Sequence, residues 1–306
     1  MTKVLIATVK PFAKAAVDQI KEVFDGAGYE CSVFEKYATQ DDFIGTVGDA
    51  DAMIIRSDKV TPEVIAAAKN LKIVVRAGAG FDNVNLEAAT ANNVVVMNTP
   101  GQNSNAVAEL AIGMMIYQAR NHFNGTSGTE LKGKKLGIHA YGNVGRLVAN
   151  IAKGFGMTIY AFDPFIAKET MEAEGVTVCD TAEELYAASD YISLHIPANT
   201  HTKKSINFDL LSNMKDGGVI INTARKEVID EDELVKLMEA KPKFKYVSDI
   251  APDNQELLKE KFEGRVFFTP KKMGAQTAEA NINAGIASAK QIIGFLENGD
   301  TTFKVN

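Results

Sequence analysis

The sequence predicts an α/β protein built from two doubly wound parallel sheets, and three observations support this fold class. Short runs of β-branched residues alternate with helical patterns along the whole chain. These runs are almost continuously apolar, as expected for strands that are buried on both faces of a parallel sheet. The alternation stops at one long helical segment and then restarts, which indicates two domains. A chain of 306 residues, 46% of them hydrophobic, is long enough to form two cores.

The first series of elements lies within residues 1–100. Its expected strands are 3–9, 31–35, 52–56, 72–76 and 94–98. Helical patterns such as PFAKAAVDQIKEVFDGAG and TPEVIAAAKN separate them. A long helix from about Asn103 to His122 is the expected bridge to the second series, and a last helix, about Ala278 to Asn298, should return to the first domain. We therefore predict one domain at 1–100 plus 278–306 and another at 101–277.

The second series repeats the pattern. Its expected strands lie in KKLGIHA, TIYAFD, YISLHIP, GVIINTA, KYVSDI and VFFTP. Ligands of doubly wound sheets bind outside the carboxyl ends of the strands. Residues that directly follow a strand are therefore the candidates for function.

Composition and charge exclude several classes of function. Asp and Glu total 39 against 33 Lys and Arg, and no basic run suggests nucleic acid. The sequence shows neither an apolar leader nor an uninterrupted apolar span of about 18 residues, so we expect no membrane insertion. The two cysteines, Cys31 and Cys179, are far apart and have no metal-ligand spacing. Unpaired thiols fit a reducing cytoplasm.

The stretch KKLGIHAYGNVGRLVANIAKGFGMTIYAFDP resembles a dinucleotide-binding strand, turn and helix. Gly142 and Gly145 occupy the last two glycine positions of that pattern, whereas Ala140 replaces the first. Alanine is tolerable there provided that its φ stays negative. The helix would begin at Asn143 and Val144, where free N–H groups and the positive end of the helix dipole can bind a pyrophosphate.

Asp163 follows Gly145 by 18 residues, at the end of the next expected strand. A carboxylate there can accept both ribose hydroxyls of an adenosine and would repel a 2′-phosphate. NAD is therefore favoured over NADP. The alternative is a glycine-rich turn that serves packing alone, but the strand, the helix and the acid are all in place.

Arg225 is the candidate for binding a substrate carboxylate. It stands just after the apolar run GVIINTA and before an acidic helix start. A guanidinium at this position can offer a bidentate fork to a carboxylate and can polarise a neighbouring carbonyl. The alternative is a surface ion pair with Glu227 or Asp230, but the position at a strand end favours the site.

Histidine is the usual acid/base for a hydroxyl proton, and the chain has four. We expect His122 to be exposed at the end of the long helix, His139 to pack in the core and His201 to lie in a polar loop. Only His195 follows a strand, where we expect it to line the cofactor cleft. The other candidates for proton transfer are the two lysines of TPKKMGA, Lys271 and Lys272.

With these residues in place, the sequence resembles the D-2-hydroxyacid dehydrogenase family, and in particular its 3-phosphoglycerate dehydrogenase branch. The most specific stretches are VRAGAGFDNVNLEAA (75–89), VVVMNTPGQNSNAVAELAIGMM (94–115) and GTELKGKKLGI (128–138). The resemblance implies a Rossmann-type NAD domain, a flavodoxin-like lid domain, a cleft between them and a homodimer formed through the NAD domains. Because the sequence ends at Asn306, we expect a short form without a regulatory domain.

The resemblance also implies roles for individual residues. Arg225 corresponds to the arginine that binds the substrate carboxylate, and backbone N–H groups around Gly78 and Ala79 correspond to the loop that holds its other oxygen. Arg56 and Arg76 match lid arginines that bind a substrate phosphate. A dianion is best met by several guanidinium donors, whereas a surface ion pair at either position would contribute only ~0–1 kcal/mol. The positions that match cofactor contacts are Gly142, Asn143, Val144, Gly145, Asp163, Ile196, Thr223, Ala224, Asp249, Gly274 and Ala275.

The chain departs from the family at the acid/base. The family reads Pro-His-x-Gly after the last strand, whereas this chain reads Pro-Lys-Lys-Met-Gly, one residue longer. Counting back from Gly274 places Lys272 in the position of the histidine, and counting forward from Pro270 places Lys271 there. Neighbouring residues of an extended segment point to opposite sides. We select Lys272, because close approach to the cofactor should fix the Gly-Ala that follows.

Two further departures concern the surroundings of that lysine. The acidic partner of the family's histidine is replaced by Asn254, and a contact between Asp253 and Lys272 stays open. An ammonium needs no acid to fix its tautomer, so the two losses are consistent. An arginine that the family's partner subunit contributes has no evident counterpart.

The resulting hypothesis is NAD-dependent oxidation of 3-phospho-D-glycerate to 3-phosphohydroxypyruvate, the first step of phosphorylated serine biosynthesis. Lys272 would take the hydroxyl proton, so its pKa must fall from the ordinary value of ~10.4. The alternatives are a glyoxylate or hydroxypyruvate reductase of the same family and an NAD-sensing, corepressor-like interaction protein.

Overall fold

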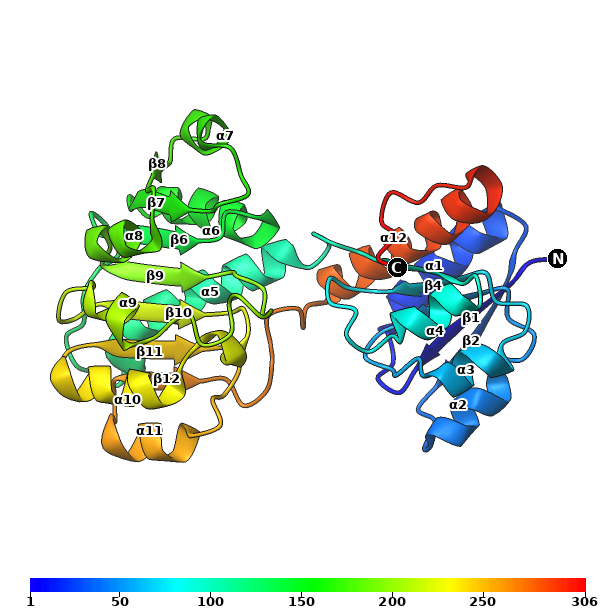
Figure 1. Ribbon diagram of the computed structural model, residues 1–306, viewed down its shortest axis with the longest axis horizontal. Helices are drawn as coiled ribbons and strands as arrows, with labels where there is room; N and C mark the ends of the chain where they lie inside the picture. The colour runs from blue at the N-terminus through cyan, green and yellow to red at the C-terminus, as the bar shows by residue number, and fades with distance from the viewer. The chain divides into compact units, whose positions relative to one another are not determined.

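The computed structural model describes residues 1–306 as two compact units (Figure 1). Unit 1 comprises Met1–Asn103 and Gln276–Asn306, and unit 2 comprises Ser104–Ala275. Each unit contains one parallel sheet with helices on both faces. The prediction of an α/β protein with two doubly wound sheets is confirmed.

The sheet of unit 1 has the strand order β2-β1-β3-β4-β5, and the pairings along it are all parallel. Its strands are β1 (Lys3–Thr8), β2 (Glu30–Glu35), β3 (Ala52–Ile55), β4 (Ile73–Arg76) and β5 (Val95–Asn98). This is the flavodoxin-like order, in which ligands bind at the carboxyl edge. Arg56 follows β3 and Arg76 ends β4, so the two arginines lie at that edge on adjacent strands.

Helices cover both faces of the sheet in unit 1. One face packs against α1 (Lys14–Gly26) and α12 (Ala278–Asn298), and the other packs against α2 (Gln40–Thr46), α3 (Pro62–Ala67) and α4 (Leu86–Ala91). The last helix lies against the first, because Gly285 leaves room for Ile20. A Cβ on Gly285 would fall 2.5 Å from the Ile20 Cδ1 atom. The carboxyl-terminal segment is thereby part of the first core.

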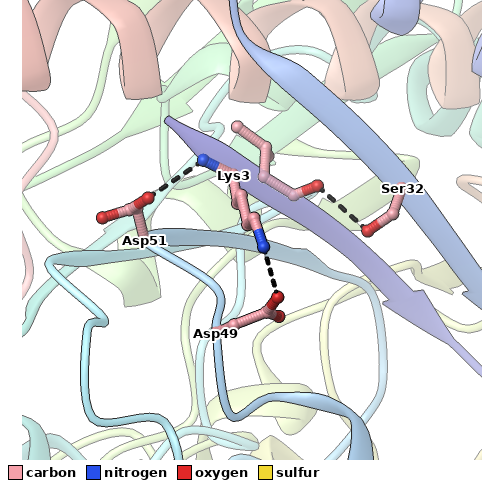
Figure 2. Close-up of polar contacts among 5 residues, drawn as sticks. Lys3, Ser32, Asp49 and Asp51 are labelled. Atoms are coloured by element: carbon pink, nitrogen blue, oxygen red, sulfur yellow. Dashed lines mark hydrogen bonds and ion pairs between the residues drawn. The ribbon is translucent and has the colours of Figure 1, made fainter. Parts of the chain in front are cut away.

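Figure 2 shows how the amino end of β1 is held. The backbone nitrogen of Lys3 donates to Asp51 (2.9 Å), and its side-chain Nζ donates to Asp49 (2.6 Å). On the neighbouring strand, the Ser32 hydroxyl donates to the Val4 carbonyl (3.4 Å). These contacts lie toward the amino ends of the strands, so they stabilise the sheet at the edge opposite to Arg56 and Arg76.

The sheet of unit 2 has seven parallel strands in the order β12-β11-β10-β9-β6-β7-β8. They are β6 (Lys135–His139), β7 (Thr158–Phe162), β8 (Thr177–Val178), β9 (Tyr191–Leu194), β10 (Val219–Asn222), β11 (Lys245–Ser248) and β12 (Val266–Phe268). The order reverses between β6 and β9, as in a Rossmann-type sheet. The carboxyl ends of β6, β9 and β10 are therefore the expected position of a ligand.

Two cores enclose this second sheet. One lies beneath α5 (Ser104–Ala119), α6 (Asn143–Gly154) and α7 (Lys168–Ala173). The other lies beneath α8 (Ala182–Ala188), α9 (Phe208–Ser212), α10 (Glu231–Ala240) and α11 (Gln255–Lys261). A short 3-10 helix, η2 (Lys226–Val228), follows β10. No helix in the chain combines the length and the apolar character needed to cross a membrane.

The long helix α5 ends earlier than expected, and the prediction of an exposed His122 is wrong. His122 lies in the short 3-10 segment η1 (Asn121–Phe123), with a φ of 56°. Its ring stacks on Tyr117 with 4.7 Å between centroids, and its Nε2 atom lies 2.9 Å from the Gln118 side-chain oxygen. Three consecutive residues with positive φ turn the chain back onto α5, so the histidine becomes half-buried.

Candidate functional site

The turn after β6 presents free backbone donors at the start of α6. Gly142 is the N-cap residue, and no side chain caps the helix. The first N–H groups of a helix have no partner within it. Gly142 and Asn143 are exposed, and nothing lies within 4 Å of a Cβ built on Gly142. The turn therefore leaves backbone donors open at the helix start where we expect a pyrophosphate to bind, around Val144.

Ala140 contradicts one assumption about this turn. Its φ is 78°, whereas the sequence argument required a negative value. The reason is the tight approach of the turn to α6. Ala140 donates its N–H to the Phe162 carbonyl (2.9 Å), and its own carbonyl oxygen would lie 2.3 Å from a Cβ on Gly145. Ala140 thus adopts a backbone conformation that normally favours glycine, which costs backbone strain.

Asp163 holds the same turn from the end of β7. Its two carboxylate oxygens accept hydrogen bonds from the backbone nitrogens of Tyr141 and Phe165, both at 2.8 Å. Each oxygen keeps a second lone pair for another donor. The acid that we expect to bind the ribose therefore also organises the loop that would bind the pyrophosphate.

His195 follows β9 and belongs to a group of buried polar atoms. Its Nδ1 atom lies 3.4 Å from the Thr223 hydroxyl, and its Nε2 atom is buried without a hydrogen-bond partner. Burial, with a smaller effect of His139, lowers the pKa of His195 to about 3. A neutral imidazole over the physiological range is a poor proton donor. The neighbouring cofactor candidates Ile196 and Ala224 are buried.

Arg225 lies three residues after the end of β10 and is half-buried. Its Nη1 atom donates to the Ala224 carbonyl (2.9 Å), and it forms no ion pair. Asp230, the alternative partner, instead pairs with Lys204 (3.3 Å) and caps α10. The guanidinium therefore keeps donors that can bind a carboxylate.

Asn222 is a residue that sequence reasoning missed. It is fully buried at the end of β10, where its side-chain oxygen accepts from the Ala224 nitrogen and its amide donates to the Arg225 carbonyl, both at 3.0 Å. This clamp fixes the turn that carries Arg225. The available signal was an amide at the end of the apolar run VIIN, where a polar side chain must find partners when buried.

The segment after β12 carries the two lysines, and both are exposed. Behind them, Met273 and Gly274 donate their backbone N–H groups to the Asp249 carboxylate at 2.7 and 2.8 Å. A Cβ on Gly274 would fall 3.1 Å from both Asp249 and Val107. Gly274 is thus tightly packed against protein atoms, and Ala275 follows it half-buried.

The acids near this segment have other partners. Asp253 forms an ion pair with Lys226. The backbone nitrogens of Asp253 and Asn254 donate to the two carboxylate oxygens of Glu231 (3.0 and 3.1 Å). Asn254, which stands where the resemblance implies an acid, belongs to this loop network.

In unit 1, Arg56 is tied to the protein by most of its guanidinium. Its Nη1 atom donates to the carbonyls of Lys10 and Pro11 (both 2.9 Å), and Nη2 donates to the Asn281 side chain. The guanidinium also lies 4.9 Å from the centroid of the Phe12 ring. Arg56 therefore joins the loop after β1 to the start of α12, a structural role that the sequence did not predict.

Arg76 lies beside Arg56 and over the loop that follows β4. Its Nε atom donates to the Arg56 carbonyl (3.0 Å). A Cβ on Gly78 would fall 1.6 Å from the Arg76 Nη1 atom, and the φ of Gly78 is 144°. Only glycine allows this approach. The Asn98 side chain donates to the Ala79 carbonyl (2.6 Å), so the four predicted substrate-binding residues of unit 1 share one sheet edge.

Comparison with known proteins identifies the family. The sequence model of the D-isomer specific 2-hydroxyacid dehydrogenase, NAD binding domain, matches residues 103–270. This chain belongs to that family. The matched region contains the turn at Gly142–Gly145, Asp163 and Arg225, and the prediction of NAD as the cofactor is confirmed. The dehydrogenase is thus an NAD-dependent member of the family.

Individual relatives in the family include two kinds of enzyme, a hydroxypyruvate reductase and phosphoglycerate dehydrogenases. A hydroxypyruvate reductase of Thermotoga maritima is 35% identical over 86% of this chain and 90% of its own length. A D-3-phosphoglycerate dehydrogenase of Methanocaldococcus jannaschii is 37% identical over 83% of this chain and 51% of its own. The chain spans about half the length of the curated phosphoglycerate dehydrogenases it matches.

A solved structure is similar over the full chain. The NAD⁺-bound 3-phosphoglycerate dehydrogenase of Entamoeba histolytica is 46% identical, covers 100% of this chain and 98% of its own, and has a TM-score of 0.90. The D-lactate dehydrogenase of Escherichia coli is 26% identical with a TM-score of 0.82. The family prediction made from the sequence is confirmed.

Proposed function

We propose that this dehydrogenase oxidises 3-phospho-D-glycerate to 3-phosphohydroxypyruvate with NAD⁺, the first step of phosphorylated serine biosynthesis. The observation that carries the proposal is the pair of arginines, Arg56 and Arg76, at the carboxyl ends of adjacent strands. A phosphate dianion is favourably bound by two guanidinium groups, whereas an unphosphorylated hydroxy acid has no such need. The likeness to phosphoglycerate dehydrogenases supports the same substrate.

Arg56 can contribute only part of its guanidinium to a phosphate. Of the five N–H groups of an arginine, three are donated to Lys10, Pro11 and Asn281, which leaves two. We assign these two, together with Arg76, to the phosphate. The N–H groups around Gly78 and Ala79 and the unpaired Arg225 are assigned to the carboxylate.

NAD⁺ would supply the acceptor for the hydride that leaves C2 of the substrate. Residues Gly142–Gly145 and Asp163 would hold the pyrophosphate and the ribose, and Ile196, Thr223, Ala224, Asp249, Gly274 and Ala275 are proposed to line the rest of the cofactor. Arg225 stabilises the carboxylate and the developing carbonyl. Lys272 takes the hydroxyl proton as a neutral amine, which requires a pKa below the ordinary value of ~10.4.

A second candidate function is hydroxypyruvate reduction. The Thermotoga maritima relative is a hydroxypyruvate reductase and is matched over 90% of its own length, whereas the phosphoglycerate dehydrogenases are matched over about half of theirs. Both reactions are hydride transfers at C2, so Arg225 and Lys272 would have the same roles. The phosphate distinguishes the two substrates.

The kcat/KM values for phosphorylated and plain substrates decide between these functions. We expect 3-phosphoglycerate to exceed D-glycerate, and 3-phosphohydroxypyruvate to exceed hydroxypyruvate and glyoxylate, each by at least about 100-fold, equivalent to about 2.7 kcal/mol. Arg76→Leu should lower kcat/KM for the phosphorylated substrates more than it lowers kcat/KM for hydroxypyruvate. Equal kcat/KM values for phosphorylated and plain substrates would favour the reductase.

We also propose a homodimer formed through the NAD domains and a cytoplasmic location. The first is tested by light scattering coupled to size-exclusion chromatography, where a mass of one chain would contradict it. The second is tested by cell fractionation.

A further inference from the structure

Asp249 is a buried carboxylate whose charge is met by a backbone segment. It is fully buried and directly follows β11. Its Oδ1 atom lies 2.7 Å from the Met273 nitrogen and 3.0 Å from the Thr269 hydroxyl, and Oδ2 lies 2.8 Å from the Gly274 nitrogen. A buried charge is tolerated only when it is hydrogen-bonded. The segment 269–274 supplies that compensation.

These bonds fix the backbone next to Lys272. The Met273 nitrogen belongs to the peptide unit that begins at the Lys272 carbonyl, and a peptide unit is planar. The hydrogen bond to Oδ1 therefore sets the orientation of the plane directly after Lys272, and the bond to Oδ2 sets the next one. Lys271 is one residue further from the held planes.

The packing of Gly274 reinforces this arrangement. A Cβ at this position would fall 3.1 Å from the Asp249 Oδ2 atom and 3.1 Å from a methyl group of Val107. A side chain at this position would therefore crowd the carboxylate that accepts the two N–H groups. If the segment moved away, the buried carboxylate would lose two of its donors.

We propose that Asp249 is a positioning residue, which holds the peptide units of Met273 and Gly274 and so directs the side chain of Lys272 for proton transfer. The inference rests on the proposed function of Lys272 as the acid/base. It adds to the role that the family resemblance implies for Asp249, which is a contact with the cofactor. In this structure both carboxylate oxygens already accept bonds from the lysine-bearing segment.

Asp249→Asn is the first test, because the amide keeps the shape and places an NH₂ group opposite one of the two backbone donors. We expect kcat to fall at least 10-fold, while the substrate KM changes less than threefold. Amide exchange of Met273 and Gly274, measured without substrate, should become at least 10-fold faster. A loss of NAD⁺ affinity with unchanged exchange would overturn the proposal.

Asp190→Asn is the matched control. Asp190 also accepts a backbone hydrogen bond, from Lys135 at 2.8 Å, but it lies at the amino ends of the strands. We expect its kcat and the exchange of Met273 and Gly274 to stay within twofold of the unmodified protein. An equal fall of kcat in both variants would mean general destabilisation and would also overturn the proposal.

The combination with Lys272→Ala decides whether Asp249 acts through the lysine. Non-additive effects are expected for residues that act as a unit. When Asp249→Asn is added to Lys272→Ala, kcat should fall by less than a further factor of three. If the kcat losses of the two single variants instead multiply in the double variant, Asp249 does not act through Lys272. Gly274→Ala displaces the segment without removing the charge. It should also lower kcat at least 10-fold, and it replaces Asp249→Asn if that variant does not fold.

These measurements are separable from the identity of the substrate. The kinetic cycle uses whichever hydroxy or keto acid the unmodified protein converts fastest. Failure of 3-phosphoglycerate as a substrate would contradict the proposed function and leave the role of Asp249 in place. Near-normal turnover of Lys272→Ala would overturn the role of Asp249.

Discussion

The backbone carbonyl of Ala140 lies against Gly145, so closely that a Cβ on Gly145 would fall 2.3 Å from the carbonyl oxygen. The same Cβ would lie 2.8 Å from a methyl group of Ile138. The turn between β6 and α6 thus depends on the absence of one side chain. That turn positions the helix start that we expect to bind the pyrophosphate.

Gly145→Ala should therefore lower the free energy of unfolding by about 1–3 kcal/mol, the range for overpacking a well-packed site. It should also weaken NAD⁺ binding. Gly154→Ala is the control, since it lies at the other end of the same helix with nothing within 4 Å of its Cβ. Urea unfolding of both variants measures the difference, and equal stabilities would contradict the packing argument.

Ala140→Gly should raise the free energy of unfolding. Removing the Cβ relieves a left-handed strain of roughly 1–2 kcal/mol, and the added flexibility of glycine in the unfolded chain costs about 0.5–1 kcal/mol. The net gain is between about 0 and about 1.5 kcal/mol. Ala187→Gly, on the exposed side of α8, should instead lower stability by about 0.5–1 kcal/mol. A destabilised Ala140→Gly variant would show that the turn carries no strain.

Arg56→Lys tests the structural role of that arginine. Lysine cannot reproduce the fork that serves Lys10, Pro11 and Asn281, so the free energy of unfolding should fall by about 1–3 kcal/mol. Arg120→Lys, on the exposed surface, should change it by less than about 0.5 kcal/mol. The KM for a phosphorylated substrate should also rise. Unchanged stability would mean that these contacts contribute little.

His139 makes stability depend on pH. Burial is the main cause that lowers the pKa of His139 from 6.5 to about 4. Between these values the unfolded chain binds a proton that the folded chain does not, so stability falls as the pH is lowered from 6.5 towards 4. At pH 5 the loss from this residue is about 2 kcal/mol. His139→Gln should remove this contribution to the pH dependence of stability, measured by urea unfolding between pH 4 and 6.5. An identical pH dependence in the variant and the unmodified protein would contradict the assignment to His139.

Much of the fold could be predicted because buried parallel strands appear in the sequence as short apolar runs. The expected strands at 31–35 and 94–98 lie within one residue of the observed β2 and β5. Arg225 was selected because it follows a strand, and Asp249 because the family resemblance implies a cofactor contact there. The sheet places both beyond the carboxyl ends of strands in unit 2. Position along the chain was sufficient for Arg225, because the carboxyl ends of the strands of a parallel sheet share one edge.

The partners of these residues could not be predicted. The bond from Arg56 to Asn281 spans 225 positions and depends on the return of α12 to the first sheet. The positive φ of Ala140 depends on packing against Gly145, and residue type alone favoured the opposite sign. Spacing indicates which edge a residue occupies, whereas hydrogen bonds depend on segments that meet only in the folded chain.

The proton-transfer role of Lys272 is tested most directly by comparing Lys272→Ala with Lys271→Ala. The account predicts that Lys272→Ala lowers kcat at least 100-fold with NAD⁺ affinity largely kept, and that Lys271→Ala stays within about threefold of the unmodified protein. Substrate oxidation by the unmodified protein should rise from pH 7 to pH 10, as the amine loses its proton. Near-normal turnover of Lys272→Ala would contradict the account.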